Sequence, residues 1–159
     1  MSYKLNYIQA LSVNSWQDTI EETFLENLKK VDFQAIFLRL TKSHKGKYLS
    51  VEEALFSLQK YGLFLFLIQK YQFKRMVPNQ EIDAVLHAHL SNGHQFEREC
   101  QHLFSASLKH LPEFGVRGED ERLEWQSAFA KTQELFELNY GEGTMGCSAA
   151  ACCEILLSF

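Results

Sequence analysis

The feature that most constrains the fold is a long apolar segment at residues 50–73, which begins with a helix start signal. Ser50 is a favourable helix N-cap residue, and Glu53 three positions later completes a capping-box pattern. The segment ends in YGLFLFLIQKYQF, which is apolar on nearly every side of a helix. A short apolar run by itself is also compatible with a buried strand, but its continuity with a capped helix favours a helix. We therefore predict that this segment forms the buried central helix.

Further helices are predicted where apolar residues recur at intervals of three and four. Pro78 breaks the chain before one of them, Gly93 is placed near the C′ position that ends it, and Gly141 ends the last. The alternating pattern of a strand is convincing nowhere in the sequence. The predicted helices and apolar helical segments cover residues 15–30, 33–40, 79–90, 95–109 and 120–140, with a loop at 110–120.

These elements predict an all-α fold. At 159 residues the chain has the length of one domain with a sizeable core. We expect a single helical domain at residues 1–141, with five to six helices in an orthogonal or irregular bundle. From residue 142 onward the sequence EGTMGCSAAACCEILLSF is rich in small residues and cysteine. We interpret residues 142–159 as a Gly/Ala/Cys tail appended to this domain.

Charge and composition exclude several classes of protein. Acidic and basic residues are interspersed and the net charge is −4, so binding of nucleic acid by bulk electrostatics is not expected. The longest apolar run, LFLFLI at residues 63–68, is too short to span a bilayer. The first residues lack a signal-peptide pattern, and four cysteines without such a signal indicate reduced thiols. We therefore expect a cytoplasmic protein, and translocation as an effector by a non-classical signal stays open.

The segment EIDAVLHAHLSNGHQFEREC at residues 81–100 concentrates histidines. On a helix, Ile82, Val85 and His89 fall on one apolar face, which directs His89 toward the core. Asp83 and His87 are four residues apart and share a neighbouring face. His87 and His89 lie about 200° apart around the same helix, so they cannot readily chelate one ion.

Two interpretations of these residues stay open. In the first, Asp83 orients His87, Cys100 and His110 join them from a distance, and His89 supports a site for zinc or iron. In the second, the histidines are hydrogen-bonded structural residues, the Asp–His pair locks helices together, and Cys100 is a small apolar side chain. The structural interpretation is favoured, because the chain has no HExxH, no paired CxxC and no glycine-rich phosphate loop. No catalytic residue is predicted.

The tail adds three cysteines. Cys147, Cys152 and Cys153 could form a thiolate cluster with Cys100, but their spacing matches no standard zinc or iron–sulfur pattern. The adjacent Cys152 and Cys153 are candidates for acylation, although the terminal LLSF is not a prenylation box. We favour a packed or flexible tail with free thiols.

Residues 60–143 carry a series of short motifs, including VP, an Asp–x–x–x–His–x–His pattern, LF and HxP. This series resembles the bacterial branch of the glycine-rich domain-containing protein-like family. Two positions depart from its pattern: Leu86 replaces a tryptophan and Ser105 replaces a glycine. The resemblance implies a helical fold with a histidine-centred feature, and it implies no chemistry. The matching residues are Val77, Pro78, Ile82, Asp83, His87, His89, Phe96, Cys100, Leu103, Phe104, His110 and Pro112.

The sequence thus favours a small bacterial protein that binds another protein and has no catalysis of its own, because its helical domain carries an acidic net charge and no recognisable catalytic set. The alternative is a zinc- or iron-binding protein, and a hydrolase among such proteins, with its site at Asp83, His87, Cys100 and His110. Elemental analysis separates the two. The sequence gives no indication of the oligomeric state.

Overall fold

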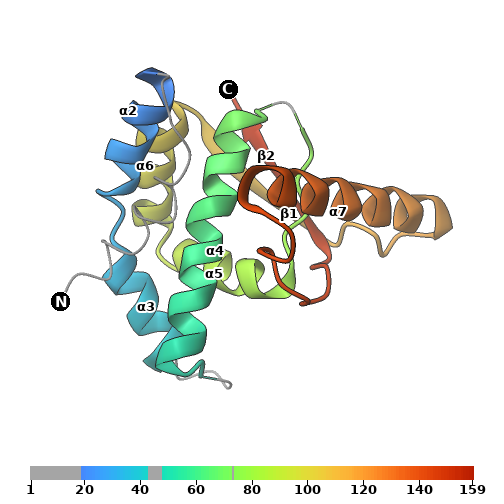
Figure 1. Cartoon of the computed structure of the whole chain (residues 1–159), viewed down its shortest axis with the longest axis horizontal. Helices are drawn as coiled ribbons and strands as arrows, with labels where there is room; N and C mark the ends of the chain where they lie inside the picture. The colour runs from blue at the N-terminus through green and yellow to red at the C-terminus, as the bar shows by residue number, and fades with distance from the viewer. Residues whose placement is uncertain (1–18, 43–47, 73) are drawn as a thin grey trace.

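The computed structural model describes residues 19–42, 48–72 and 74–159. These residues form six helices and one two-stranded antiparallel sheet (Figure 1). The mostly helical architecture predicted from the sequence is confirmed, whereas the sheet was not predicted. Residues 15–18 of the first predicted helix lie outside the described residues. The elements are α2 (Thr19–Leu28), α3 (Phe33–Lys42), α4 (Val51–Lys70), α5 (Gln80–Leu90), α6 (Gly93–Phe104), β1 (Ser107–Pro112), α7 (Glu119–Tyr140) and β2 (Cys153–Ser158).

Helix α4 is the central element. Its N-terminus has the predicted capping box, in which the Glu53 amide donates to the Ser50 hydroxyl and the Ser50 amide donates to the Glu53 carboxylate. Its second half is buried from Tyr61 to Ile68, as its apolar sequence predicted. Figure 1 shows α4 between α2, α3 and α6 on one side and α7 on the other. None of the helices in the described ranges combines the length and apolar character needed to cross a membrane.

The boundaries of α6 correct two predictions. Gly93 was expected to end the preceding helix, but it is the first residue of α6. The side chain of Asn92 caps this helix by accepting a hydrogen bond from the Gln95 amide, at 3.1 Å. The helix was expected to continue to Lys109, but it ends at Phe104 because Ser105 adopts a left-handed backbone conformation with φ of 51°.

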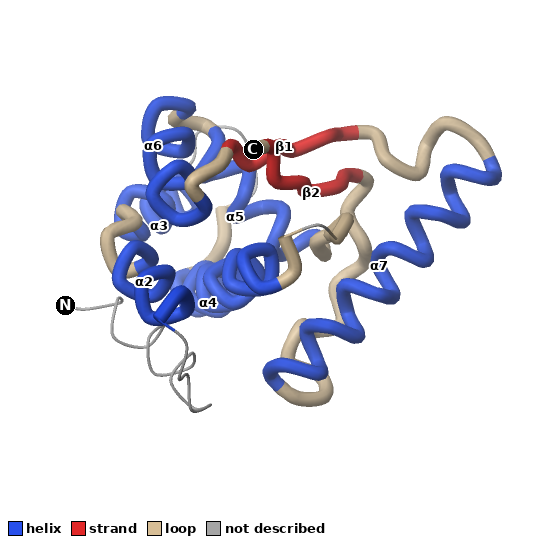
Figure 2. Tube along the Cα trace, turned by 90° about the horizontal axis from the view of Figure 1, so that it is seen from above, coloured by secondary structure: helices blue, strands red, loops and turns tan. Residues whose placement is uncertain are grey.

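The two strands correct the expectation of an all-α chain. β1 pairs with β2 in antiparallel register, with Ser107 opposite Ser158 and Pro112 opposite Cys153. Figure 2 shows the strands side by side, with the chain after β1 reaching out to α7. Each strand has only six residues, and their pairing joins segments that are far apart in the sequence. Local periodicity cannot reveal such a pair, because neither strand is long enough to display a clear alternation.

Residues 142–159, which were expected to be an appended tail, pack onto the helical part. The Ile155 amide donates to the Met76 carbonyl at 2.8 Å, and the Ala151 amide donates to the Pro78 carbonyl at 2.9 Å. The indole of Trp125 in α7 donates to the Ala151 carbonyl at 2.7 Å. These bonds hold the C-terminal segment beside the start of α5. Its buried residues are Met145, Ala151, Cys153, Glu154 and Ile155.

Candidate metal centre

Helix α5 orients its two histidines in different directions. Asn79 caps the helix by accepting a hydrogen bond from the Ile82 amide, at 3.0 Å. The side chains of Ile82 and Val85 are fully buried, and this fixes the rotation of the helix about its axis. As the helical pattern predicted, His89 is buried with an exposed fraction of 0%, whereas 61% of the His87 side chain is exposed.

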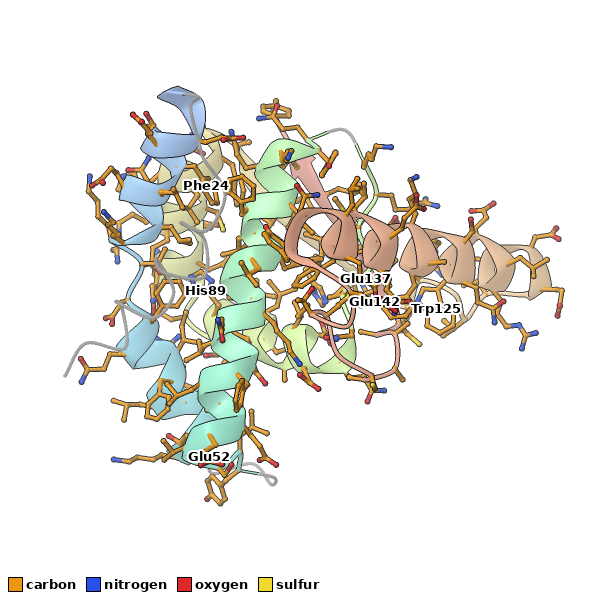
Figure 3. The ribbon with its side chains drawn as sticks, viewed as in Figure 1. Phe24, Glu52, His89, Trp125, Glu137 and Glu142 are labelled. Atoms are coloured by element: carbon orange, nitrogen blue, oxygen red, sulfur yellow. The ribbon has the colours of Figure 1, made fainter. Side chains whose placement is uncertain are left out.

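His89 belongs to a closed network in the interior, beside α4 (Figure 3). Its Nδ1 lies 2.8 Å from the Tyr61 hydroxyl, and its Nε2 lies 2.9 Å from Glu99 Oε1. Glu99 also accepts hydrogen bonds from the Gln95 side-chain amide and from the Asp32 backbone amide, both at 2.8 Å. Both ring nitrogens of His89 therefore have protein partners, and neither is free to bind a metal ion.

These contacts also determine the charge of Glu99. Burial acts to raise its pKa, because the charged form is poorly solvated in the interior. The hydrogen bonds from His89, the Asp32 backbone and Gln95 lower the pKa and outweigh burial. The net shift is downward, so Glu99 is an internal carboxylate whose charge is satisfied by its neighbours.

A second cluster, which we call the rim cluster, consists of Asp83, His87 and His110. His87 Nε2 lies 3.3 Å from Asp83 Oδ2, and His110 Nε2 lies 3.4 Å from Asp83 Oδ1. The two imidazole rings meet edge to face with their centroids 4.9 Å apart. One ligand atom from each residue lies within 4.8 Å of the others. Asp83 and His87 are one turn apart on α5, and β1 brings His110 to them.

The buried nitrogen of His110 distinguishes the rim cluster from the interior network. Only 12% of the His110 side chain is exposed. Its Nε2 is buried and lies at ion-pair distance from Asp83 Oδ1, but it makes no well-aligned hydrogen bond to any described residue. A buried polar atom without a partner costs about 1–3 kcal/mol. A bound ion would remove this cost.

The Asp83 carboxyl group is in the ionised form in which a carboxylate binds a metal ion. Burial acts to raise its pKa, but the neighbouring His110, His87 and Cys153 lower it by a larger amount. The net shift is downward, so the carboxylate is ionised at neutral pH. Asp83 thus presents its two carboxylate oxygens to the two imidazoles, with Oδ2 near His87 Nε2 and Oδ1 near His110 Nε2.

Cys153 also contacts the rim cluster, which the sequence did not predict. Its buried thiol donates a hydrogen bond to Asp83 Oδ1, with Sγ and Oδ1 3.4 Å apart. The sequence had grouped this residue with Cys100 instead. Burial and the adjacent Asp83 raise the pKa of Cys153, so its thiol is protonated and is not an activated nucleophile. The contact joins residues 70 positions apart, so a local sequence pattern cannot predict it.

Cys100 lies apart from the rim cluster. It is buried on the apolar face of α6, and burial, with a contribution from Glu99, raises its pKa to about 12. It belongs to no ligand cluster in the described part of the chain. Of the five residues considered from the sequence, the structure brings together Asp83, His87 and His110, and it leaves His89 and Cys100 in the core.

The rim cluster matches a known donor set. Two histidines and one carboxylate bind iron in the facial-triad arrangement, and zinc accepts the same ligands. Metal–ligand bonds of about 2 Å place ligand atoms roughly 3–4 Å apart. The observed spread of up to 4.8 Å is wider than this by about 1 Å, so the side chains would move toward an ion on binding it. The exposed ring of His87 leaves one side of the cluster accessible to solvent.

Comparison of the chain with family models, curated proteins and solved structures finds no significant match. The resemblance to the glycine-rich domain-containing protein-like family therefore stays a prediction based on the motifs themselves. Two of its positions have a clear structural role. Ser105, where the family has glycine, adopts the left-handed conformation that glycine enters without steric cost. Leu86, where the family has tryptophan, is buried in the core.

Proposed function

We propose that this protein binds a divalent transition-metal ion, zinc or iron, through Asp83, His87 and His110. The observation that carries the proposal is the convergence of three ligand atoms within 4.8 Å, one of which is the buried Nε2 of His110, which makes no well-aligned hydrogen bond. The sequence favoured a protein-interaction module, and the geometry shifts the preference to the metal-binding alternative. His89 and Cys100 are not part of the proposed site.

The chemistry of the three residues supports this proposal. Imidazole nitrogen and carboxylate oxygen are good ligands for zinc and for iron. The negative charge of Asp83 offsets part of the charge of a divalent ion. Three protein ligands leave the remaining coordination positions for water or for another residue. With water there, hydrolysis is the activity that such an ion supports, because the ion lowers the pKa of its bound water.

The metal content of the protein tests this proposal directly. The protein should be purified without a histidine tag, analysed for bound metals, stripped with a chelator and titrated with zinc. We expect about one zinc ion per chain. The His110→Ala variant should bind zinc at least about 100-fold more weakly, since loss of a ligand costs at least as much as loss of a residue that only supports a ligand.

His94→Ala is the matched control, because His94 is an exposed histidine on α6 and lies outside the rim cluster. Its zinc affinity should equal that of the wild type. Equal zinc affinity in the wild type and in His110→Ala would contradict the proposed site.

A specific surface feature favours the second candidate, a protein-interaction module. The large apolar side chains of Val51 and Phe56, near the start of α4, and of Tyr48, just before it, have exposed fractions of 53%, 62% and 54%. Large exposed apolar side chains within one short stretch of chain are candidates for a contact surface. Phe56→Ser should leave the fold intact and abolish the capture of a partner protein. Unchanged capture by this variant would exclude this surface.

A further inference from the structure

The four cysteines of the chain have different surroundings, and only one touches the rim cluster. Cys147 and Cys152 are exposed, and Cys100 is buried in α6. Cys153 is the first residue of β2 and donates its thiol hydrogen to Asp83. A sulfur atom, a good zinc ligand, therefore lies 3.4 Å from the carboxylate that both imidazoles of the rim cluster contact.

The backbone holds Cys153 in this place from both sides. In the β1–β2 ladder it lies opposite Pro112, two positions from His110. The segment on either side of it bonds to the chain before α5, through the Ala151 and Ile155 amides. These bonds fix the backbone of Cys153 relative to both elements of the rim cluster. Its Sγ is not among the ligand atoms that lie within 4.8 Å of one another, so the side chain has to rotate from Asp83 toward the histidines to reach a shared ion.

From this arrangement we infer that Cys153 is the fourth ligand, and that the ion is a four-coordinate zinc bound by Asp83, His87, His110 and Cys153. The inference rests on the proposed metal site and specifies its coordination. On binding, the S–H bond of Cys153 breaks, a Zn–S bond forms and the proton leaves to water. The reaction needs no oxidant or reductant.

Four protein ligands give the site a structural role. Zinc sites with four protein ligands are closed, whereas catalytic sites keep a position for water or substrate. The proposed ion joins α5 to both strands of the sheet, and β2 is the C-terminal element of the chain. Zinc therefore attaches the C-terminal segment to the helical part, and hydrolysis at this ion is not expected.

Cobalt substitution tests the fourth ligand, because Co²⁺ occupies zinc sites and reports their ligands by its absorption. A cobalt–thiolate bond gives an intense charge-transfer band in the near ultraviolet, which histidine and aspartate do not give. We expect this band in the wild type, its loss in Cys153→Ser and its retention in Cys152→Ser. Cys152 is the matched control, because it is the adjacent cysteine and its side chain is exposed.

The outcomes separate this inference from the proposed function. If cobalt binds in a 1:1 ratio, is lost in His110→Ala and shows no thiolate band, the three-residue site stands and the fourth ligand is overturned. If the wild type binds cobalt no better than His110→Ala, the proposed three-residue site and the fourth ligand are both overturned. The wild-type spectrum shows whether a thiolate is a ligand, and the comparison with His110→Ala shows whether the ion binds at the rim cluster. Neither outcome depends on the folding of the cysteine variant.

Hydrogen exchange tests the attachment of the C-terminal segment. The Ile155 amide bonds to the Met76 carbonyl and its exchange reports whether β2 is docked. Zinc should slow the exchange of this amide in the wild type and in Cys152→Ser, and it should have at least about tenfold less effect in Cys153→Ser. Equal protection in Cys153→Ser and the wild type would overturn the role of the thiol.

Discussion

The two histidines of α5 form two His–carboxylate pairs that differ in their surroundings. His89 and Glu99 are 2.9 Å apart in the closed interior, and His87 and Asp83 are 3.3 Å apart at the rim. In the interior network, Tyr61 bonds the other nitrogen of His89. At the rim, a second histidine, His110, contributes a buried nitrogen that contacts Asp83 but makes no well-aligned hydrogen bond to a described residue. The same residue types thus serve packing in one place and offer ligand atoms in the other.

The largest expected effect is on stability and distinguishes the two pairs. His89→Ala leaves the buried Glu99 carboxylate without its imidazole and should lower the free energy of unfolding by about 3–5 kcal/mol. His87→Ala, at an exposed position, should change it by less than about 0.5 kcal/mol when a chelator is present. Urea unfolding followed by circular dichroism measures both. Equal losses in the two variants would remove the distinction between the network and the rim.

The second effect concerns zinc and should appear only at the rim. An ion that binds the folded state stabilises it by about 2.7 kcal/mol at a free concentration 100 times the dissociation constant. Thermal unfolding with and without zinc should show this gain in the wild type and in His94→Ala. The gain should be absent in His110→Ala. A gain that persists in His110→Ala would show that zinc binds elsewhere.

The third effect is the loss of stability in acid through Glu99. The folded-state pKa of Glu99 lies below its ordinary value of 4.5, because hydrogen bonds from His89, Asp32 and Gln95 outweigh burial. Its stabilising contribution is therefore complete above about pH 4.5 and is lost as the pH falls through the lowered folded-state pKa. Glu99→Gln should have a smaller loss of stability across this window than the wild type.

Denaturant unfolding at pH values from 3 to about 6 measures the difference for Glu99. Asp83, whose pKa is also lowered, is present in both proteins, so its contribution cancels in the comparison. Parallel pH profiles of the two proteins would show that the charge of Glu99 does not contribute to the free energy of unfolding.

The smallest effect concerns Cys100, which the sequence placed in the candidate metal site. Cys100→Ala removes one buried sulfur and should cost about 1 kcal/mol, as for a small apolar group. Its zinc stoichiometry and its cobalt–thiolate band should match those of the wild type. If Cys100→Ala lost bound zinc or the cobalt–thiolate band, Cys100 would be a metal ligand and the assignment of Cys153 would be weakened.

Local sequence patterns account for much of the helical part. The capping box of Ser50 and Glu53 and the cap at Asn79 depend on hydrogen bonds within three residues, and a sequence displays such spacings directly. The rotation of α5 follows equally from the positions of its apolar residues. The end of α6 was harder to predict from the sequence, because Ser105 adopts a left-handed conformation that glycine usually occupies.

The sequence by itself determined which residues of α5 share a face, and hence that His89 enters the core while Asp83 and His87 lie together. Only the tertiary structure decided that His110 of β1 and Cys153 of β2 lie next to Asp83. The physical reason is that strand pairing is made by hydrogen bonds between distant segments, and six-residue strands have too few side chains to reveal it in advance. Of the four residues in the proposed site, α5 therefore contributes Asp83 and His87, and the sheet contributes His110 and Cys153.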